Sequence, residues 1–522
     1  MGENLSFRED FLFWKLAHLL ISEHGYRLLQ ISKSEKEIWL ENMESKDNQV
    51  IRILLHPLDW SNWLQRDIQL TLANAESVRR QLKKRTIHVF TIYITPYPPV
   101  DEYEFRIEKP AIHSKGDQTK VTSVIVDRSN GVETIENALD TSLHLNLKEE
   151  YEEAEIEREK QATLFAVKEK VKTEKALLNN GKPIFTYIFI AIQLIVFVLM
   201  EIVGGSTNTA TLIDFGAKVN WLILQGEWWR LFTPIFIHIG ILHLAMNTLS
   251  LYYLGMMVEQ IYGNFRFLFI YLIAGFFGTL ASLLFSTNIS AGASGAIFGC
   301  LGALLYFGTS YPKLFKRTMG ANILLVIVIN LVFGFSVSGI DNAGHIGGLV
   351  GGFLAAAIVH LPKSKRVLFQ LSALIVSVVL VFGSFQFSLA NRGKLLDEQT
   401  ALVLSQNYLQ SEEYDEAYKL LNEYNSQNGS TVHTLFQLSF SELKTGRVQE
   451  AKEHLHEIIE VDPRFHEALY NLSLIYVSEG VLAEAKKYAN QALKEQPSNP
   501  DYQNLLKEIT NLESGQSSAL GA

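Results

Sequence analysis

The chain has 522 residues and a formal net charge of −9. This acidic balance, with no sustained basic patch, argues against nucleic acid as a partner, and the single cysteine, Cys300, excludes an intrachain disulfide framework. The middle of the chain is almost devoid of charge while both ends are rich in Lys and Glu, so we expect several domains of different character.

Residues 1–150 predict a small α/β domain that begins with a helix near Arg8 to Ser22. The expected strands are Tyr26–Ile31, Glu37–Leu40, Val50–Leu55, Ile87–Thr95 and Val121–Val126, and the expected long helix is Trp60–Lys84. This order is similar to nuclease-like cores, but no strand carries an acid-x-Lys pair, so we interpret the domain as a binding or regulatory module. His88, His113 and Asp117 lack the spacing of metal ligands, and no metal site is predicted.

A charged helix is expected between Leu147 and Leu178, which is rich in Glu and Lys and has no helix breaker until Asn179-Asn180-Gly181. Residues 151–181 are therefore interpreted as a helical linker from the first domain to the membrane. A coiled-coil pairing of this helix stays open, although its apolar positions are sparse.

Residues 182–390 predict a polytopic membrane domain. Each of seven apolar segments is near the roughly 17–25 residues that cross the hydrocarbon of a bilayer. They are Ile184–Val203, Pro234–Val258, Phe265–Phe285, Ala293–Thr309, Asn322–Ile340, Gly344–Leu361 and Val367–Ala390.

Basic residues in the short connections predict the orientation of these spans. They follow the second, fourth and sixth spans, and they are Arg266, Lys313, Lys316, Arg317, Lys363, Lys365 and Arg366. The loops on the other side carry mainly Lys218 and Arg230. By the positive-inside rule, we expect a multi-pass protein of the cell membrane with a cytoplasmic N-terminus, and an odd number of spans then places the C-terminus outside.

The first loop, Gly204 to Thr233, is too aromatic for a free loop and includes Trp221, Trp228 and Trp229. We expect it to lie partly in the outer leaflet, as interfacial aromatic side chains do.

Residues 391–522 predict a soluble extracytoplasmic domain built from repeats. Several features recur at a spacing of 34 residues: Glu416-Ala417, Glu450-Ala451 and Glu484-Ala485, then Gly446 and Gly480, then Pro463 and Pro497. The period and these positions resemble tetratricopeptide repeats, which are stacked helix pairs with a concave groove for peptides or proteins. Around three repeats fit, and the first is degenerate.

Ser294 lies between glycines at the start of an apolar helix, in Gly292-Ala293-Ser294-Gly295. Backbone N–H groups are unpaired at a helix N-terminus, and the helix dipole there favours a developing negative charge. The alternative is a face of small residues for helix packing. Four other polar residues in or beside apolar spans favour the functional interpretation, because such residues are costly in lipid; they are His238, His243, Asn247 and His345.

Taken together, these residues resemble the rhomboid family of intramembrane serine proteases. The matching features are His238, His243 and Asn247, then Gly292-Ala293-Ser294-Gly295, then Gly344-His345-Ile346-Gly347-Gly348 with Gly352, and Trp229-Arg230 in the first loop. The resemblance covers Pro183 to about His360. It implies a multi-domain protein whose polytopic α-helical core has six rhomboid helices plus a seventh span, between an N-terminal α/β domain and a C-terminal α-helical tetratricopeptide-like domain.

The resemblance also implies a catalytic Ser-His dyad that cleaves transmembrane segments near the outer membrane face. A serine hydroxyl needs a base, and His345 is the base expected at the depth of Ser294. Asn247 and His243 match the oxyanion positions of the family. The implied supporting residues are His238, Gly292, Gly295, Phe298, Trp229, Arg230 and Gly348. No cofactor or metal is implied.

Three residues refine this expectation. Many rhomboids have Tyr four residues after the nucleophile, whereas this chain has Phe298, which packs on a ring but forms no hydrogen bond. Asp341 is interpreted as a loop or helix-cap residue rather than a third catalytic member. Gly348 and its neighbours are expected to bring the sixth span against the fourth.

Two rival functions remain at this stage. A rhomboid-like adaptor would bind membrane proteins and present them to other machinery without cutting, but the intact pair Ser294 and His345 weighs against it. A transporter would need ionisable residues along its spans, and this chain has almost none besides the histidines. The expected partners are membrane-protein substrates, protein ligands of the two soluble domains, and the lipid bilayer.

Overall fold

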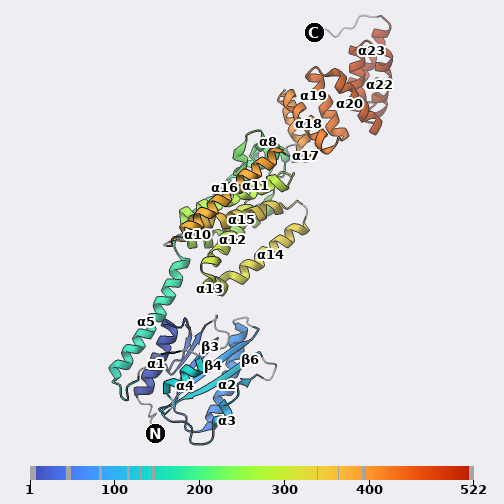
Figure 1. The fold of residues 1–522 in the computed structure, drawn as a ribbon. Helices are drawn as coiled ribbons and strands as arrows, with labels where there is room; N and C mark the ends of the chain where they lie inside the picture. Colours follow the sequence, from blue (N-terminus) through green and yellow to red (C-terminus); the bar gives the residue numbers. More distant parts are fainter. Residues whose placement is uncertain are drawn as a thin grey trace. The chain divides into compact units, whose positions relative to one another are not determined.

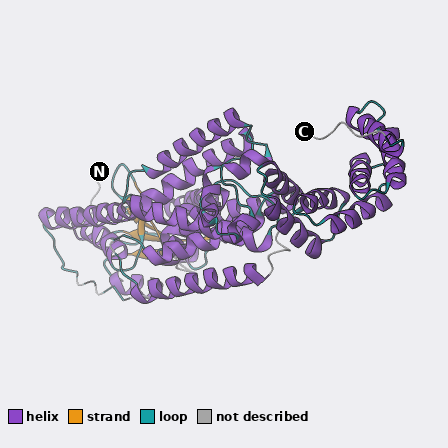
Figure 2. Ribbon diagram, turned by 90° about the horizontal axis from the view of Figure 1, so that it is seen from above, coloured by secondary structure: helices purple, strands orange, loops and turns teal. Residues whose placement is uncertain are grey.

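The computed structural model describes residues 7–42, 49–81, 85–113, 118–129, 131–139, 142–143, 145, 147–337, 339–362, 364–390 and 396–515. Lys84, Asp117 and Lys363, which entered the predictions above, lie outside these ranges. The chain forms two compact units, Met1–Leu177 and Leu178–Ala522 (Figure 1). Figure 2 shows the strands gathered in one sheet and helices making up most of the remaining described chain.

The first unit is a mixed sheet with helices on its faces. Over the described residues the sheet has six strands in the order β1-β2-β3-β4-β6-β5. The strands are β1 Arg27–Ile31, β2 Glu37–Glu41, β3 Val50–Leu55, β4 Ile87–Ile94, β5 Ala111–Ile112 and β6 Thr119–Val126. The strands β1, β2 and β3 pair antiparallel, while β3, β4 and β6 pair parallel. The predicted α/β domain is therefore present.

The helices of this unit are α1 Phe7–Ser22, α2 Ser61–Gln81, α3 Glu104–Ile107, α4 Gly131–Leu139 and α5 Glu153–Leu178. The strand predictions agree with the structure to within two residues. The elements α3, α4 and β5 were not predicted, because each is too short to show a clear period.

The charged helix α5 packs on the first unit. Ile156 and Val167 join the core formed by α1 and the sheet. Thr163 is buried and donates to the carbonyl oxygen of Trp14, and the Lys170 ammonium donates to the carbonyl oxygen of Tyr26 at 3.0 Å. The apolar positions that looked too sparse for a coiled coil thus pack within the same unit.

A buried ion-pair network lies between β3 and α2. The Arg52 guanidinium is only 5% exposed and donates to Asp67, Thr71 and Glu37, and Tyr93 donates to Asp67 at 2.7 Å. Every partner in this network is a side chain of the unit itself. Since a buried charge is tolerated when it is paired and hydrogen-bonded, we interpret the network as structural.

The second unit begins with a bundle of apolar helices. Over the described residues, six helical stretches are long and apolar enough to cross a membrane, and a seventh is shorter. They are α6 Phe185–Val203, Ile241–Tyr262 (α9 Ile241–Ser250, η3 Leu251–Gly255, α10 Met256–Tyr262), α11 Asn264–Phe285, Pro312–Ser336 (α13 Pro312–Phe315, η4 Lys316–Gly320, α14 Ala321–Ser336), α15 Asn342–Val359 and α16 Val367–Ala390, with α12 Ser294–Ser310 as the shorter one. The helix that carries Ser294 is thus the short one.

Two predicted spans have different limits in the structure. The second begins at Ile241 rather than Pro234, because Thr233–Phe236 forms a short 3-10 helix (η2) and Gly240 has φ +77°. The fifth begins at Pro312 and ends at Ser336, because the helix extends through the basic residues before the apolar run, and Val337 is extended. Hydropathy locates apolar segments, whereas backbone conformation sets the helix ends.

Small residues let three helices of the bundle pack so closely that their backbones are in contact. The helix α15 packs against both α11 and α12. A Cβ added to Gly348 would lie 1.9 Å from the Gly295 carbonyl oxygen, and one added to Gly352 would lie 2.1 Å from the Gly299 carbonyl oxygen. Only glycine fits at such contacts, as is typical of close helix packing in membranes.

Glu259 caps the first span from inside the bundle. Its side chain is fully buried and accepts hydrogen bonds from the backbone N–H groups of Ile184, Phe185 and Thr186 at 2.8–2.9 Å. It also accepts from the Thr186 hydroxyl and the Asn264 side-chain amide. Glu259 therefore has a structural role, since helix N-terminal N–H groups need acceptors when buried.

We expect Glu259→Ala to lower the free energy of unfolding by about 3 kcal/mol or more, because several buried donors would lose their acceptor. Glu259→Gln should cost less, since its carbonyl oxygen still accepts. Thermal unfolding of the purified protein in detergent would measure both. Gln260→Ala, at the next and only partly buried position, is the matched control. An unchanged melting temperature for Glu259→Ala would contradict the capping role.

The repeats form seven helices over the described residues of the C-terminal part: α17 Glu398–Gln410, α18 Tyr414–Asn428, α19 Val432–Lys444, α20 Val448–Val461, α21 His466–Ser478, α22 Leu482–Glu495 and α23 Pro500–Glu513. Gly446 and Gly480 have φ of +82° and +75° between the two helices of a pair. The equivalent residue of the first repeat, 34 positions before Gly446, is Glu412, with φ +62°. The degenerate repeat thus keeps the turn without the glycine that favours it.

The first repeat also packs on the first loop of the membrane domain. Ile213, Trp221 and Leu222 of the loop share one hydrophobic core with Leu404 and Leu420 of α17 and α18. The repeats are therefore docked on the membrane domain at the end where that loop lies.

Candidate active site

Ser294 is the first residue of α12, where the turn before it is held tightly. Gly292 has φ +141°, and a Cβ at this position would lie 2.6 Å from Cε1 of His243. The Gly292 N–H donates to the carbonyl oxygen of Pro234 at 2.9 Å. Glycine is needed here both for the backbone conformation and for the close approach of the histidine ring.

The helix α12 is shorter than the hydrocarbon core of a bilayer is thick. Its 17 residues span about 25 Å, less than the roughly 30 Å of a hydrocarbon core. If the other end of α12 reaches the interface, its first residue lies several ångströms inside.

His345 faces Ser294 from the first turn of α15. Its Nε2 atom lies 2.9 Å from the Ser294 Oγ atom, although the residues are 51 positions apart in sequence. This is hydrogen-bond distance for a nucleophile and its base. The structure thus brings together the two residues expected to form the dyad.

The His345 ring rests on Phe298, one turn along α12. The two rings are stacked, with centroids 4.3 Å apart and an interplanar angle of 10°. Phe298 therefore fixes the plane of the imidazole by packing, as expected for a residue that lacks a hydroxyl group.

Asp341 is a helix cap, as the sequence predicted. Its carboxylate accepts from the Gly344 N–H at 2.8 Å and from the Ser290 hydroxyl at 2.7 Å. Within the described part of the chain, no hydrogen-bond partner reaches Nδ1 of His345. Asp341 therefore caps α15 and does not hydrogen-bond the His345 ring.

His243 and Asn247 lie one turn apart on α9, beside the serine turn. The Gly292 backbone lies against the His243 ring. The Asn247 side-chain amide donates to the His243 carbonyl oxygen at 3.0 Å, so in this state it is engaged with its own helix. His243 therefore borders the serine turn, whereas the Asn247 amide contacts the backbone of α9.

His238 supports the same turn. It is fully buried, its Nε2 accepts from the Ala293 N–H at 3.4 Å, and its ring meets the His243 ring edge to face at 5.3 Å. His238, which the resemblance implied as a supporting residue, thus contacts the backbone directly before Ser294.

Trp229 and Arg230 hold the first loop together. Arg230 is only 5% exposed, and its guanidinium donates to the carbonyl oxygens of Ile213 and Ala217 at 2.7 and 3.1 Å and to Glu227 at 2.6 Å. The guanidinium carbon lies 4.3 Å from the centre of the Trp229 ring. A buried charge with this many partners fixes the loop in one fold.

Sequence comparison decides the family. The Rhomboid domain family matches residues 225–362, and the Tetratricopeptide repeat family matches residues 442–509. Rhomboid protease GluP of Bacillus subtilis (strain 168) is 41% identical over 462 residues, which cover 88% of this chain and 90% of that protein. This chain belongs to the rhomboid family.

Further relatives agree. Rhomboid protease AarA of Providencia stuartii is 29% identical over 255 residues, which cover 43% of this chain and 90% of that protein. Putative rhomboid protease YdcA of Bacillus subtilis (strain 168) is 30% identical over 190 residues, which cover 35% of this chain and 92% of that protein. The chain is therefore an intramembrane serine protease with tetratricopeptide repeats.

Sequence reasoning gave no structural role to two residues near the serine turn, Lys218 and Ser290. Lys218 is fully buried, and its ammonium donates to the carbonyl oxygens of Ser286 and Asn288 at 2.8 and 3.0 Å. Burial lowers the pKa of Lys218 to about 7, and the charges of Asp341 and Asp397 oppose this shift. The sequence did show one lysine, Lys218, in an otherwise aromatic loop, but it was used only as a loop charge for predicting the orientation of the spans.

The described residues of this rhomboid contain no cluster of metal ligands. Among the described residues, no three His, Cys, Asp or Glu side chains lie close enough to hold an ion. His88 instead pairs with the Thr122 hydroxyl at 2.7 Å across β4 and β6. Cys300 is buried inside α12.

Proposed function

We propose that this rhomboid cleaves transmembrane segments of membrane proteins near the outer face of the membrane, through a dyad of Ser294 and His345. The observation that carries the proposal is the 2.9 Å distance between His345 Nε2 and Ser294 Oγ at the starts of α15 and α12. The alternative of a non-cutting adaptor is not favoured, because both reactive groups are present and in contact.

In the proposed reaction, Ser294 Oγ attacks the carbonyl carbon of the scissile peptide while His345 Nε2 takes the hydroxyl proton. The C–N bond then breaks, and the imidazolium returns the proton to the departing amine. A water molecule activated by the same imidazole hydrolyses the acyl-enzyme. Each step uses one proton and one base, as a dyad allows.

The negative charge on the tetrahedral intermediate needs donors near Ser294. The backbone N–H groups at the start of α12 are oriented for it, and the helix dipole adds to their effect. We propose that the His243 and Asn247 side chains complete this oxyanion site, with Asn247 leaving the His243 carbonyl oxygen when substrate binds. Loss of one such donor typically lowers turnover about 10²- to 10³-fold.

In this proposal, the orientation of the spans in the membrane follows from the basic residues at their ends. Arg266, Lys313, Lys316 and Arg317 lie at the opposite ends of the spans from Ser294 and His345. If that end is cytoplasmic, the dyad, the first loop and the repeats all lie at the outer face. Cleavage of a transmembrane test segment by purified protein in liposomes, with the cut located by product mass, tests both activity and depth.

The repeats are proposed to recruit substrate proteins. Their docking on the first loop determines how this is tested, because a deletion from residue 391 would also expose Trp221 and Leu222. A deletion from residue 429 instead keeps α17 and α18 on the loop and removes the later repeats.

We expect the deletion from residue 429 to reduce cleavage of full-length partners several-fold more than cleavage of a short test segment. The physical reason is that only the full-length partner gains from a second binding site. Rates on both substrates, measured side by side, check this. The deletion from residue 391 should slow both reactions, since the first loop loses part of its core. Equal effects of the shorter deletion on the two substrates would remove the recruitment proposal.

A further inference from the structure

One carboxylate joins the two loops that precede the reactive helices. The Oδ2 atom of Asp341 accepts from the Ser290 hydroxyl at 2.7 Å, and its Oδ1 atom accepts from the Gly344 N–H at 2.8 Å. Ser290 is four residues before Ser294, and Asp341 is four residues before His345. A single side-chain bridge therefore spans the gap between the two loops, at equal distance in sequence from both reactive groups.

Each end of this bridge is rigid. On the base side, the His345 N–H donates to the Asp341 carbonyl oxygen at 3.1 Å, so Asp341 is continuous with the first turn of α15. On the nucleophile side, Ser290 forms a two-way backbone ladder with Lys218, at 2.9 and 3.2 Å. Only a short turn then leads from Ser290 to Ser294.

The first loop holds this ladder in place. The buried Lys218 ammonium and the Asn220 side-chain amide both donate to the Ser286 carbonyl oxygen, at 2.8 and 2.9 Å. Ser290 is thus fixed by its backbone, and its hydroxyl is the group that reaches Asp341. The chain of contacts runs from the first loop through Ser290 and Asp341 to the helix of the base.

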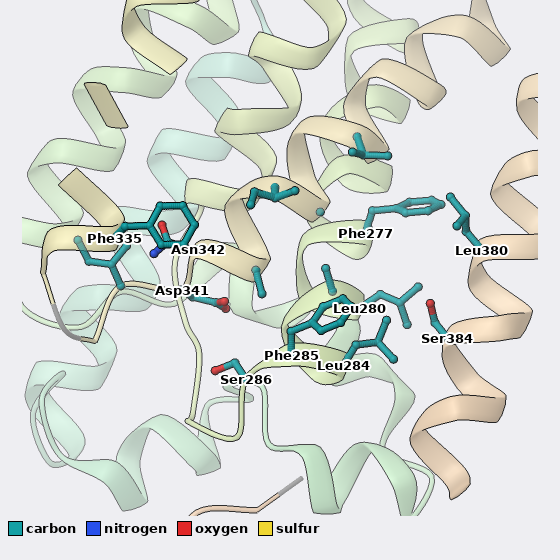
Figure 3. A pocket seen from close by; sticks show the side chains of 16 residues that line it. Phe277, Leu280, Leu284, Phe285, Ser286, Phe335, Asp341, Asn342, Leu380 and Ser384 are labelled. Atoms are coloured by element: carbon teal, nitrogen blue, oxygen red, sulfur yellow. The ribbon is translucent and has the colours of Figure 1, made fainter. Parts of the chain in front are cut away.

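Asp341 also lies at the polar end of an apolar cavity of about 640 Å³ between α11, α15 and α16. Figure 3 shows Asp341 and Ser286 at this end, with Phe277, Leu280 and Leu380 on the apolar walls and Ser384 on α16. The bridge therefore stands beside a space that gives little packing support to the loop before α15. In such a place a hydrogen bond has more effect on position than it would inside a packed core.

We propose that the Ser290–Asp341 hydrogen bond positions His345 against Ser294, and that both residues are positioning residues of the reaction. The inference rests on the proposed dyad. Deeper in the bundle the contact between Gly348 and Gly295 sets the helix separation, whereas the bridge sets it at the reactive end. A displacement of about 1 Å at reacting atoms can lower a rate on the order of 10²-fold.

Three substitutions distinguish the effect of losing the Ser290–Asp341 hydrogen bond from the effects of losing the cap of α15 or the negative charge of Asp341. Ser290→Ala removes the bridge and leaves the cap of α15 intact. Asp341→Ser keeps a good N-cap residue but is too short to reach Ser290. Asp341→Asn loses the charge but keeps both contacts, because its carbonyl oxygen accepts from Gly344 and its amide donates to the Ser290 oxygen.

We expect Ser290→Ala and Asp341→Ser each to lower kcat about 10- to 100-fold with KM little changed. Asp341→Asn should stay within about threefold of the wild type. The double variant Ser290→Ala with Asp341→Ser should be no slower than the slower single variant, because both remove the same interaction. Ser384→Ala, on the opposite wall of the cavity, is the matched control and should keep the wild-type rate.

The measurements are steady-state cleavage of a transmembrane test segment in liposomes and the rate at which a fluorophosphonate labels Ser294. In labelling, the serine oxygen forms a bond to phosphorus and fluoride leaves, so the rate reports nucleophile activation without peptide binding. Unfolding temperatures of all variants are measured alongside. Labelling and kcat are expected to fall together.

Two results would overturn the inference. One is a wild-type kcat and labelling rate for Ser290→Ala. The other is an Asp341→Asn variant as slow as Asp341→Ser, which would assign the effect to charge. Failure of the proposed dyad is distinguishable, because it would appear as undiminished activity of a variant without Ser294.

Discussion

Replacing Ser294 or His345 with alanine is expected to lower cleavage of a transmembrane segment by about 10⁴-fold or more, while the protein stays folded. In the proposed dyad, Ser294 supplies the attacking oxygen, and His345 Nε2, 2.9 Å away, supplies the base. The two effects should not add, because each variant removes the same reacting unit. Cleavage in liposomes, followed by product mass, measures the loss.

The same helices offer matched controls. Ser310 is the last residue of α12, and His360 follows the last residue of α15, where it contacts the Tyr306 hydroxyl at 2.6 Å. Ser310→Ala and His360→Asn change the same residue types at the far ends of the two helices. Both should keep activity within a few-fold. Activity that survives in Ser294→Ala would refute the dyad.

Gly348→Ala is expected to lower activity by about 100-fold or more and to destabilise the fold. The added methyl carbon would lie 1.9 Å from the Gly295 carbonyl oxygen, and that neighbour is backbone rather than a flexible side chain. The helix α15 must therefore move away from α12, which separates His345 from Ser294. Overpacking of this kind typically costs about 1–3 kcal/mol, and the misplaced dyad adds the larger effect on rate.

Gly383 provides the control for this substitution. It lies in α16, and no heavy atom stands within 4 Å of the place where its Cβ would be. Gly383→Ala should keep the wild-type rate and should not lower the unfolding temperature, because alanine is the better helix former by about 1 kcal/mol. Equal rates for the two alanine variants would show that the glycine contact does not set the dyad geometry.

The sequence predicted much of this molecule for identifiable reasons. The strands of the first unit are short runs rich in β-branched residues and were found within two residues of their limits. The spans are long apolar runs, and all but the second and fifth were found equally closely. Ser294 and His345 stood out because polar residues are costly in lipid. Their approach to 2.9 Å needed the structure, since no sequence period links positions 51 residues apart.

Other features left no trace in the sequence pattern. The bridge between Ser290 and Asp341 depends on how two loops fold, and neither loop has a period. The second span begins late because Pro234 supports a 3-10 turn, although the residues there are as apolar as those of a helix. The charged linker packs on α1 through scattered residues such as Thr163, which a search for heptads does not find.

The shared core of the first repeat and the first loop has a consequence for substrate choice. A binding module on a flexible tether offers its cargo at an effective concentration that changes slowly with tether length. If the repeats recruit substrate as proposed, a module docked through Trp221 and Leu420 instead holds the bound protein at a fixed distance from the dyad. A protein whose recognised segment lies at the wrong distance from its scissile bond would then be held without being cut, and would act as a competitive inhibitor.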